Sequence, residues 1–233
     1  MHFVVHVGEI VGVGGVMGSG RSRLLETVAG ARKPESGKVL VDGVELRSGD
    51  IASARDAGMS FVPEDRDRQG LIGRHSIERN IRLNAYRSFQ FPRVDLDRKI
   101  ADGMSAALRI KPSHSGVRVE ILSGGNAQKV IFGRELSREP LVFVLDEPTR
   151  GVDIAARADT YDLIRSRVEQ GAAILLASSD IQELATLCDR VIVLFEGSLV
   201  GELESDSIDE EGIILLASGA AQRPSAGDEA IEQ

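Results

Sequence analysis

Residues 15–22 read GVMGSGRS and have the glycine spacing of a loop that wraps a nucleotide phosphate. Glycines are needed there because backbone amides must approach phosphate oxygens closely, and the helix expected next adds the positive end of its dipole. Arg21 stands where the template has lysine, so the charge is kept on a planar, bulkier group. The alternative is a glycine-rich turn that binds no phosphate. The predicted phosphate-loop residues are Gly15, Gly18, Ser19, Gly20, Arg21 and Ser22, the last as a Mg²⁺ ligand.

A second motif, LVFVLDEPT at residues 141–149, is a buried strand that ends in two carboxylates. The strand end would place Asp146 near Mg²⁺ and Glu147, as the catalytic base, near an attacking water. A charged pair that merely ends a strand is the alternative. The phosphate loop upstream disfavours it, because the separation is typical of nucleotide-binding α/β domains.

The stretch ILSGGNAQKVIFGREL at residues 121–136 predicts a helix with an anion-binding start. Ser123 is the expected N-cap, and Gly124 and Gly125 expose backbone amides in front of the first turn. An ordinary capped helix is the alternative.

The elements that must position these residues follow from hydrophobic periodicity. A strand at 9–15, the loop and a helix at 22–31 come first, and residues 37–46 contain a hairpin turn at Asp42–Gly43. Residues 59–70 predict a strand that runs into a charged loop, and residues 67–138 are polar and helix-prone. From residue 141 strands and helices alternate, which predicts an α/β fold with a mostly parallel sheet covered by helices. The later expected elements are a helix at 156–171, a strand at 172–179, a helix at 180–188 and a strand at 189–197.

Composition limits the classes of function. The 233 residues carry 28 basic and 36 acidic side chains, a net charge of -8, which argues against a general binder of nucleic acid or anionic membranes. The single cysteine, Cys188, lies in an apolar stretch and is expected to be a buried, inert thiol. His75 and His114 are isolated, so surface histidines are preferred to a metal site. No apolar run is long enough to span a bilayer, and the N-terminus lacks the features of a signal peptide, so a cytoplasmic protein is expected.

In this order the phosphate loop, LSGGN, VLDEPT and GVD resemble the ATP-binding cassette of ABC transporters, up to about Ser218. The stretches GSGRS, FVPEDRDRQGL, LSGGNAQKV, LDEPTRGVDIAAR and SSDIQEL resemble more closely the second, C-terminal cassette of the tandem ATPases that energise bacterial ribose, galactose, xylose and related sugar importers. Those proteins carry two cassettes in one polypeptide, so the chain looks like a C-terminal half or the product of a shortened gene. The resemblance implies a P-loop NTPase fold with an ATP-binding domain at 1–218, a helical subdomain at about 67–138 and a small antiparallel β-piece, and the composition of 219–233 predicts a disordered tail.

The resemblance also implies roles for single residues. Glu64 occupies the place where most cassettes have the glutamine that senses Mg²⁺ and the membrane subunit, and Ser179 the place of the switch histidine. Asp153 falls in the loop that crosses to the partner cassette. The signature, which in the family contacts the γ-phosphate bound to the opposite cassette, would be Ser123, Gly124, Gly125 and Asn126.

Three departures from the family cluster at the chain's own nucleotide site: Arg21, Glu64 and Ser179. Serine is too short and not basic enough to hold a γ-phosphate as an imidazole does, and Glu64 adds negative charge near phosphate. The hypothesis is a division of labour, in which this site is slow while the signature serves a competent site on a second cassette. The implied function is hydrolysis of ATP with Mg²⁺, coupled to sugar import through membrane permease subunits and, indirectly, a sugar-binding protein, at the cytoplasmic face of the membrane.

Three alternatives stay open. The departures favour a non-hydrolysing regulatory nucleotide-binding module, although the retained Glu147 argues against a complete loss of hydrolysis. An importer ATPase for nucleosides or another solute is possible because related tandem cassettes share VPEDR and LSGGN. A cassette that acts on DNA or ribosomes is disfavoured by the acidic balance.

Two apolar features are predicted to be core rather than site. Cassettes open with a strand whose aromatic residue stacks on adenine, but Phe3 is close to the phosphate loop and is expected to pack in the core. The apolar helix EEGIILLAS at residues 210–218 is likewise expected to pack in the core.

Overall fold

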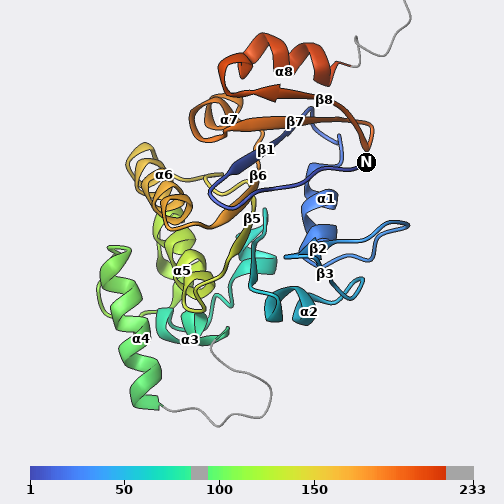
Figure 1. Cartoon of the computed structure of the whole chain (residues 1–233). Coiled ribbons are helices and arrows are strands. Elements are labelled where there is room, and N and C mark those ends of the chain that lie inside the picture. The colour runs from blue at the N-terminus through green and yellow to red at the C-terminus, as the bar shows by residue number, and fades with distance from the viewer. Residues whose placement is uncertain (85–93, 219–233) are drawn as a thin grey trace, which may run out of the picture.

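The computed structural model describes residues 1–84 and 94–218, and within them the chain forms a six-stranded sheet covered by helices (Figure 1). The strand order is β4-β5-β6-β1-β7-β8, with parallel pairs from β4 to β7 and an antiparallel pair of β7 with β8. These strands are β1 (Ile10–Gly15), β4 (Met59–Val62), β5 (Val142–Asp146), β6 (Ala173–Ala177), β7 (Arg190–Phe195) and β8 (Ser198–Glu204). The mostly parallel α/β sheet predicted from the sequence is confirmed.

A small antiparallel hairpin lies to one side of the main sheet. Its strands are β2 (Leu40–Val41) and β3 (Val44–Glu45). Asp42 and Gly43 connect them with φ angles of 49° and 76°, the left-handed conformation of a two-residue hairpin turn. The hairpin predicted at this dipeptide is therefore confirmed.

Helices cover both faces of the sheet and extend beyond it. The α-helices are α1 (Arg21–Val28), α2 (Ile51–Asp56), α3 (Ile77–Arg82), α4 (Val94–Ala107), α5 (Gly124–Leu136), α6 (Ile154–Glu169), α7 (Ile181–Leu187) and α8 (Glu210–Ala217). Short turns of other helix types are η1 (Arg66–Gly70), η2 (Val119–Ile121) and η3 (Ser205–Ser207).

Alternate residues of the central strands point to opposite faces of the sheet and into two separate core clusters. In β6, Ile174 and Leu176 pack into one cluster, whereas Leu175 and Ala177 pack into the other, which also contains Leu25 of α1. A strand buried on both faces must be apolar along its whole length, which explains the unbroken run AILLA. Polar side chains are therefore excluded from the middle of the sheet and gather at the strand ends.

A third core cluster holds the helical region together. It joins Ile77 and Ile81 of α3, Ala101 of α4 and Val130 of α5. The described part of 67–138 contains helices and, apart from one isolated bridge between Ser76 and Arg118, no β-pairing. The helical subdomain was expected over this stretch, but its limits remain a prediction, and the expected tail at 219–233 lies outside the described residues.

The C-terminal part of the sheet contains a strand that the sequence analysis did not predict. β8 follows β7 after the turn Glu196–Gly197 and pairs with it out to Arg190–Glu204. Next comes α8, where Ile213 and Ala217 are buried in the first core cluster, as expected for residues 210–218.

The remaining predictions about single residues have clear outcomes. Cys188 is a free, buried thiol whose pKa is raised by burial, as expected for an inert cysteine. Phe3 packs against the second core cluster. His114 is exposed, whereas His75 is half-buried instead of lying on the surface. Among residues 1–84 and 94–218 no helix is both long and apolar enough to cross a bilayer.

The space around two glycines, one in β1 and one in α4, predicts opposite effects on stability when each is replaced by alanine. A Cβ at Gly12 would lie 2.8 Å from both Cys188 Sγ and Val191 Cγ2, whereas one at Gly103 of α4 meets no atom within 4 Å. Gly12→Ala should lower the free energy of unfolding by about 1–3 kcal/mol through overpacking. Gly103→Ala should raise it by about 0.5–1 kcal/mol, because alanine loses less backbone entropy in a helix. Urea unfolding followed by circular dichroism measures both, and equal stability of the two variants would contradict this account.

Candidate nucleotide-binding site

The predicted phosphate loop joins the C-terminal end of β1 to the first turn of α1, at the edge of the sheet where open α/β folds bind ligands (Figure 1). Gly15 has a φ of 147°, and a Cβ there would lie 2.5 Å from the carbonyl oxygen of Leu194 and from Ser19 Oγ. Only glycine fits this position. Beside it Met17 is 98% exposed, and a Cβ placed on Gly18 would meet no atom within 4 Å, so the outer side of the loop is open.

Arg21 does not extend into solvent but crosses the ends of the neighbouring strands. Its Nη1 donates to the carbonyl oxygen of Ser178, and its Nη2 lies 3.4 Å from Glu147 Oε1. Both side chains of this ion pair are largely buried, with 12% and 10% of their surface exposed. The sequence predicted a phosphate-facing cation here, and the structure pairs that cation with the predicted catalytic base.

Glu147 itself has an unusual backbone conformation. Its φ is 50°, in the left-handed region that non-glycine residues rarely adopt, and its amide donates to the carbonyl oxygen of Ala177 at 2.9 Å. Ser179 Oγ donates to Glu147 Oε2 at 3.0 Å. Strained residues held by several contacts often mark functional sites. Three of the predicted site residues, Arg21, Glu147 and Ser179, are thus brought into direct contact.

A second group of oxygen atoms lies at the start of α1. Ser22 Oγ donates to Glu64 Oε2 at 3.1 Å. Asp146 is 2% exposed, and its buried Oδ1 has no hydrogen-bond partner among the described residues. Burial, reinforced by the charges of Glu64 and Glu147, raises the pKa of Asp146 to about 7, against a hydrogen bond with Ser22 that lowers it. Hydroxyl and carboxylate oxygens, one of them without a partner, fit a Mg²⁺ ion.

The predicted signature opens α5 and is set apart from the phosphate loop. Ser123 is the N-cap residue, but its hydroxyl accepts from Asn126 Nδ2 at 2.9 Å instead of capping a backbone amide. No hydrogen bond or ion pair in the described ranges joins residues 123–126 to residues 15–22. The signature therefore lies outside the cluster around Glu147, and its predicted contact with a second cassette remains a prediction.

Asp153 lies beside the signature. A Cβ on Gly125 would come within 3.4 Å of Asp153 Oδ2 and 2.5 Å of Ala156 Cβ, so the first turns of α5 and α6 are in close contact. Asp153 caps α6 by accepting from the Ala156 amide at 2.9 Å. Its predicted role toward a partner is compatible with this position but is not tested by it.

Arg150 is a site residue that was not predicted from the sequence, and it forms an ion pair with Glu64 Oε1. Arg150 follows the buried Thr149, whose hydroxyl donates to Glu183 Oε1 at 2.6 Å. The only available signal was the position of Arg150 directly after the carboxylate motif.

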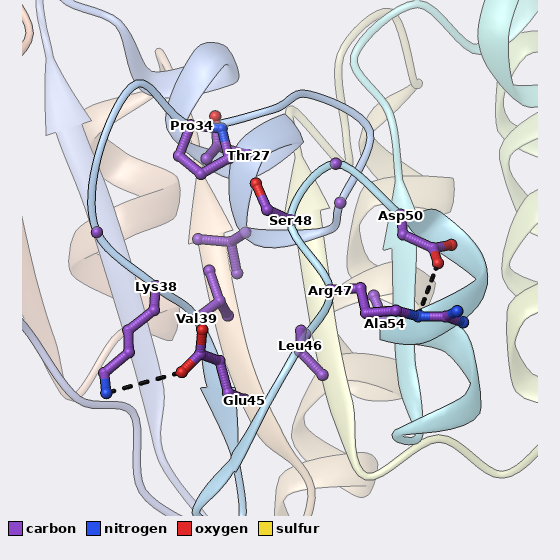
Figure 2. A pocket seen from close by; sticks show the side chains of 14 residues that line it. Thr27, Pro34, Lys38, Val39, Glu45, Leu46, Arg47, Ser48, Asp50 and Ala54 are labelled. Carbon is purple, nitrogen blue, oxygen red and sulfur yellow. Dashed lines mark ion pairs between the residues drawn. The ribbon is translucent and has the colours of Figure 1, made fainter.

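A separate pocket lies between the end of α1, the hairpin and α2 (Figure 2). Two ion pairs border it, Lys38–Glu45 at 3.8 Å and Arg47–Asp50 at 3.1 Å. None of the predicted site residues lines this pocket.

Comparison with known proteins agrees with this geometry. A nucleotide-free ATP-binding cassette from an ABC transporter has the same fold, with a TM-score of 0.78, 19% identity and coverage of 92% of this chain and 89% of that one. The model of the ABC transporter family matches residues 1–150, so the chain belongs to the ABC transporter family. The expected class of enzyme, an ABC-type ATPase, and the expected P-loop NTPase fold agree with this membership.

Within this family, the chain is similar to proteins that are named as ribose import ATP-binding proteins. The chain is 38% identical over 222 residues to the ribose import ATP-binding protein RbsA of Chromobacterium violaceum. The aligned residues cover 94% of this chain and 44% of the relative. It is 41% identical over 227 residues to the protein of the same name from Chelativorans sp., with coverage of 96% and 44%. The chain thus spans less than half the length of these relatives.

The buried carboxyl of Asp146 predicts a pH dependence of stability in the ligand-free chain. Because its folded pKa of about 7 lies above the ordinary value of 3.8, the protonated carboxyl favours the folded state at low pH, and this contribution is lost as the pH rises through 7. Asp146→Asn lacks that loss. When the pH rises from 5.5 to 8, the free energy of unfolding of the unsubstituted chain should therefore fall by about 1–2 kcal/mol more than that of the variant. Urea unfolding in EDTA at both pH values tests this, and parallel pH profiles would contradict it.

Proposed function

We propose that the chain is the C-terminal ATP-binding cassette of a tandem ABC ATPase that energises the import of ribose or a related simple sugar. The relatives named as ribose import ATP-binding proteins support the substrate class. The match to less than half of their length supports a protein with two cassettes. The motifs GSGRS, FVPEDRDRQGL and LSGGNAQKV support the C-terminal position.

The observation that carries the proposal is the convergence of the phosphate loop, Ser22, Asp146 and Glu147 at one edge of the sheet. In this proposal the loop amides bind the phosphates of ATP, and Ser22 and Asp146 hold Mg²⁺. The ion, when bound, neutralises phosphate charge. Glu147 Oε1 or Oε2 accepts the proton of the attacking water.

The contacts of Glu147 support a slow reaction at this site. A base must be free to take a proton, but Arg21 and Ser179 hold both of its oxygens. A water can reach either oxygen only after one of these contacts has opened. We therefore propose that the site binds nucleotide but turns it over slowly, while residues 123–126 complete a competent site on a second cassette.

The proposed partners follow from the same assignment. Besides the second cassette, they are membrane permease subunits that contact the helical region and, indirectly, a sugar-binding protein. The chain would then lie at the cytoplasmic face of the membrane as a peripheral subunit. Nucleic acid is not a proposed partner, because the net charge of the chain is -8.

The Arg21–Glu147 ion pair also favours a second candidate, a regulatory module that binds nucleotide without hydrolysing it. An importer of nucleosides or another solute would share the same cassette, and the genes beside the coding sequence would distinguish these substrates. Loss of transport with intact nucleotide binding, after Glu147→Gln in the full assembly, would exclude a purely regulatory role.

A concentration series tests the slow-site proposal. ATP should bind to the purified chain in the presence of Mg²⁺, and phosphate release per chain should stay near the level of Glu147→Gln as the protein concentration rises. Calorimetry and a phosphate-release assay measure the two quantities. Turnover that grows faster than linearly and disappears in Glu147→Gln would contradict the proposal, because two copies would then form a working pair of sites.

Substitution of the signature tests the division of labour. Ser123→Arg places a bulky charge at the exposed start of α5, away from the chain's own phosphate loop. In the full assembly it should lower transport and ATP hydrolysis by at least about tenfold, within the range seen when phosphate-stabilising groups are lost. Nucleotide affinity of the isolated chain should not change. Unaffected transport would show that residues 123–126 serve no second site.

A further inference from the structure

Glu64 is held from two sides. One carboxylate oxygen, Oε2, accepts from the hydroxyl of Ser22 at 3.1 Å, and the other, Oε1, forms the ion pair with Arg150. Ser22 lies in the first turn of α1, directly after the phosphate loop, so Glu64 brings a negative charge to the place where phosphate is expected. Such a charge repels phosphate unless it is neutralised.

The backbone of Arg150 is fixed. Its amide donates to the carbonyl oxygen of Glu147 at 3.1 Å, and its own carbonyl oxygen accepts from Arg66 Nη1 at 3.2 Å. Thr149, the preceding residue, is tied to Glu183 in the core. These contacts fix the backbone from which the Arg150 side chain extends. Its guanidinium pairs with Glu64, which lies 86 residues earlier in the sequence.

Two of the three carboxyl groups at the site are paired with arginines. Of the carboxylates near the strand ends, Glu147 is paired with Arg21 and Glu64 is paired with Arg150. Within the described part of the chain no ion pair joins Asp146 to an arginine, although the charge of Arg21 acts on it from a greater distance. Each arginine cancels one carboxylate. Of these three carboxyl groups, Asp146 is the one that is not held in an ion pair among the described residues.

We propose that Arg150 is a positioning residue of the nucleotide site, which neutralises and orients the Glu64 carboxylate so that the phosphates of a nucleotide can bind beside it. This inference rests on the proposed function, because it concerns the same site. Arg150 acts through Glu64, and within the described residues its side chain forms no hydrogen bond or ion pair with any other predicted site residue. It leaves Ser22 and Asp146 to meet the cation.

Binding of ADP, measured by calorimetry in EDTA and in excess Mg²⁺, tests the proposal without any need for turnover. In EDTA, Arg150→Ala should raise the Kd about threefold to tenfold, the size expected for a partly exposed charge pair. In Mg²⁺ the Kd should rise less than about twofold, because the cation takes over the neutralisation. Arg150→Lys should restore most of the affinity, since it keeps the charge.

The double variant identifies the partner. In a Glu64→Gln background, Arg150→Ala should change the Kd in EDTA by less than about twofold, because the charge it neutralises has been removed. Arg118→Ala is the matched control: the Arg118–Glu120 pair is 67% and 43% exposed, close to the 63% and 37% of Arg150–Glu64, and lies outside the site. It should leave the Kd unchanged.

The outcomes separate this inference from the function it builds on. Equal losses of affinity in EDTA and in Mg²⁺, or the same loss with and without Glu64→Gln, would show that Arg150 only supports the fold and would overturn the inference. Absence of ADP binding by the unsubstituted chain would overturn the proposed function itself. Circular dichroism of each variant checks that it is folded.

Discussion

Burial of the central sheet on both faces is the constraint on which the site depends. Strands β1, β5 and β6 are apolar along their length because each face packs into a different core cluster. Polar and charged side chains of these strands can therefore lie only where the strands end. The parallel order of these strands brings several ends to one edge, so the phosphate loop, Asp146, Glu147 and Ser179 meet there although they come from distant parts of the sequence.

Once carboxylates are gathered at such an edge, their charges must be balanced. Glu64, Asp146 and Glu147 influence one another, and the pKa of Asp146 rises because burial and both neighbours oppose its ionisation. Arg21 and Arg150 each balance one of the other two. In the proposed site, one buried carboxyl is then left to meet a cation. The arrangement supports the proposed nucleotide binding more directly than rapid hydrolysis, because the predicted base is the carboxylate that Arg21 and Ser179 hold.

The turn after β5 connects this edge of the sheet to the helical region. Arg66 donates to the carbonyl oxygen of Arg150, and its guanidinium would lie 2.9 Å from a Cβ on Gly124. The start of the signature and the Glu64–Arg150 pair are therefore neighbours through Arg66. Arg66 thus links the two segments through one hydrogen bond and one close contact. The two parts of the proposed division of labour, nucleotide binding and the signature, thus share a common support.

The sequence by itself determined the elements and the kind of chemistry. Periodicity located the central strands and the main helices around them, and the Asp42–Gly43 dipeptide specified its turn. Glycine spacing located the loop, in which a Cβ does not fit at Gly15. These features are local, since they depend on backbone conformation or on burial of a single segment. The edge strand β8 was missed, because its half-exposed residues give a weaker pattern than the fully buried strands. Only the tertiary structure decided which charges meet. The pairing of Arg21 with Glu147 and of Arg150 with Glu64 joins segments far apart in the chain, and no local pattern specifies such a pair because the packing of the sheet alone brings its members together.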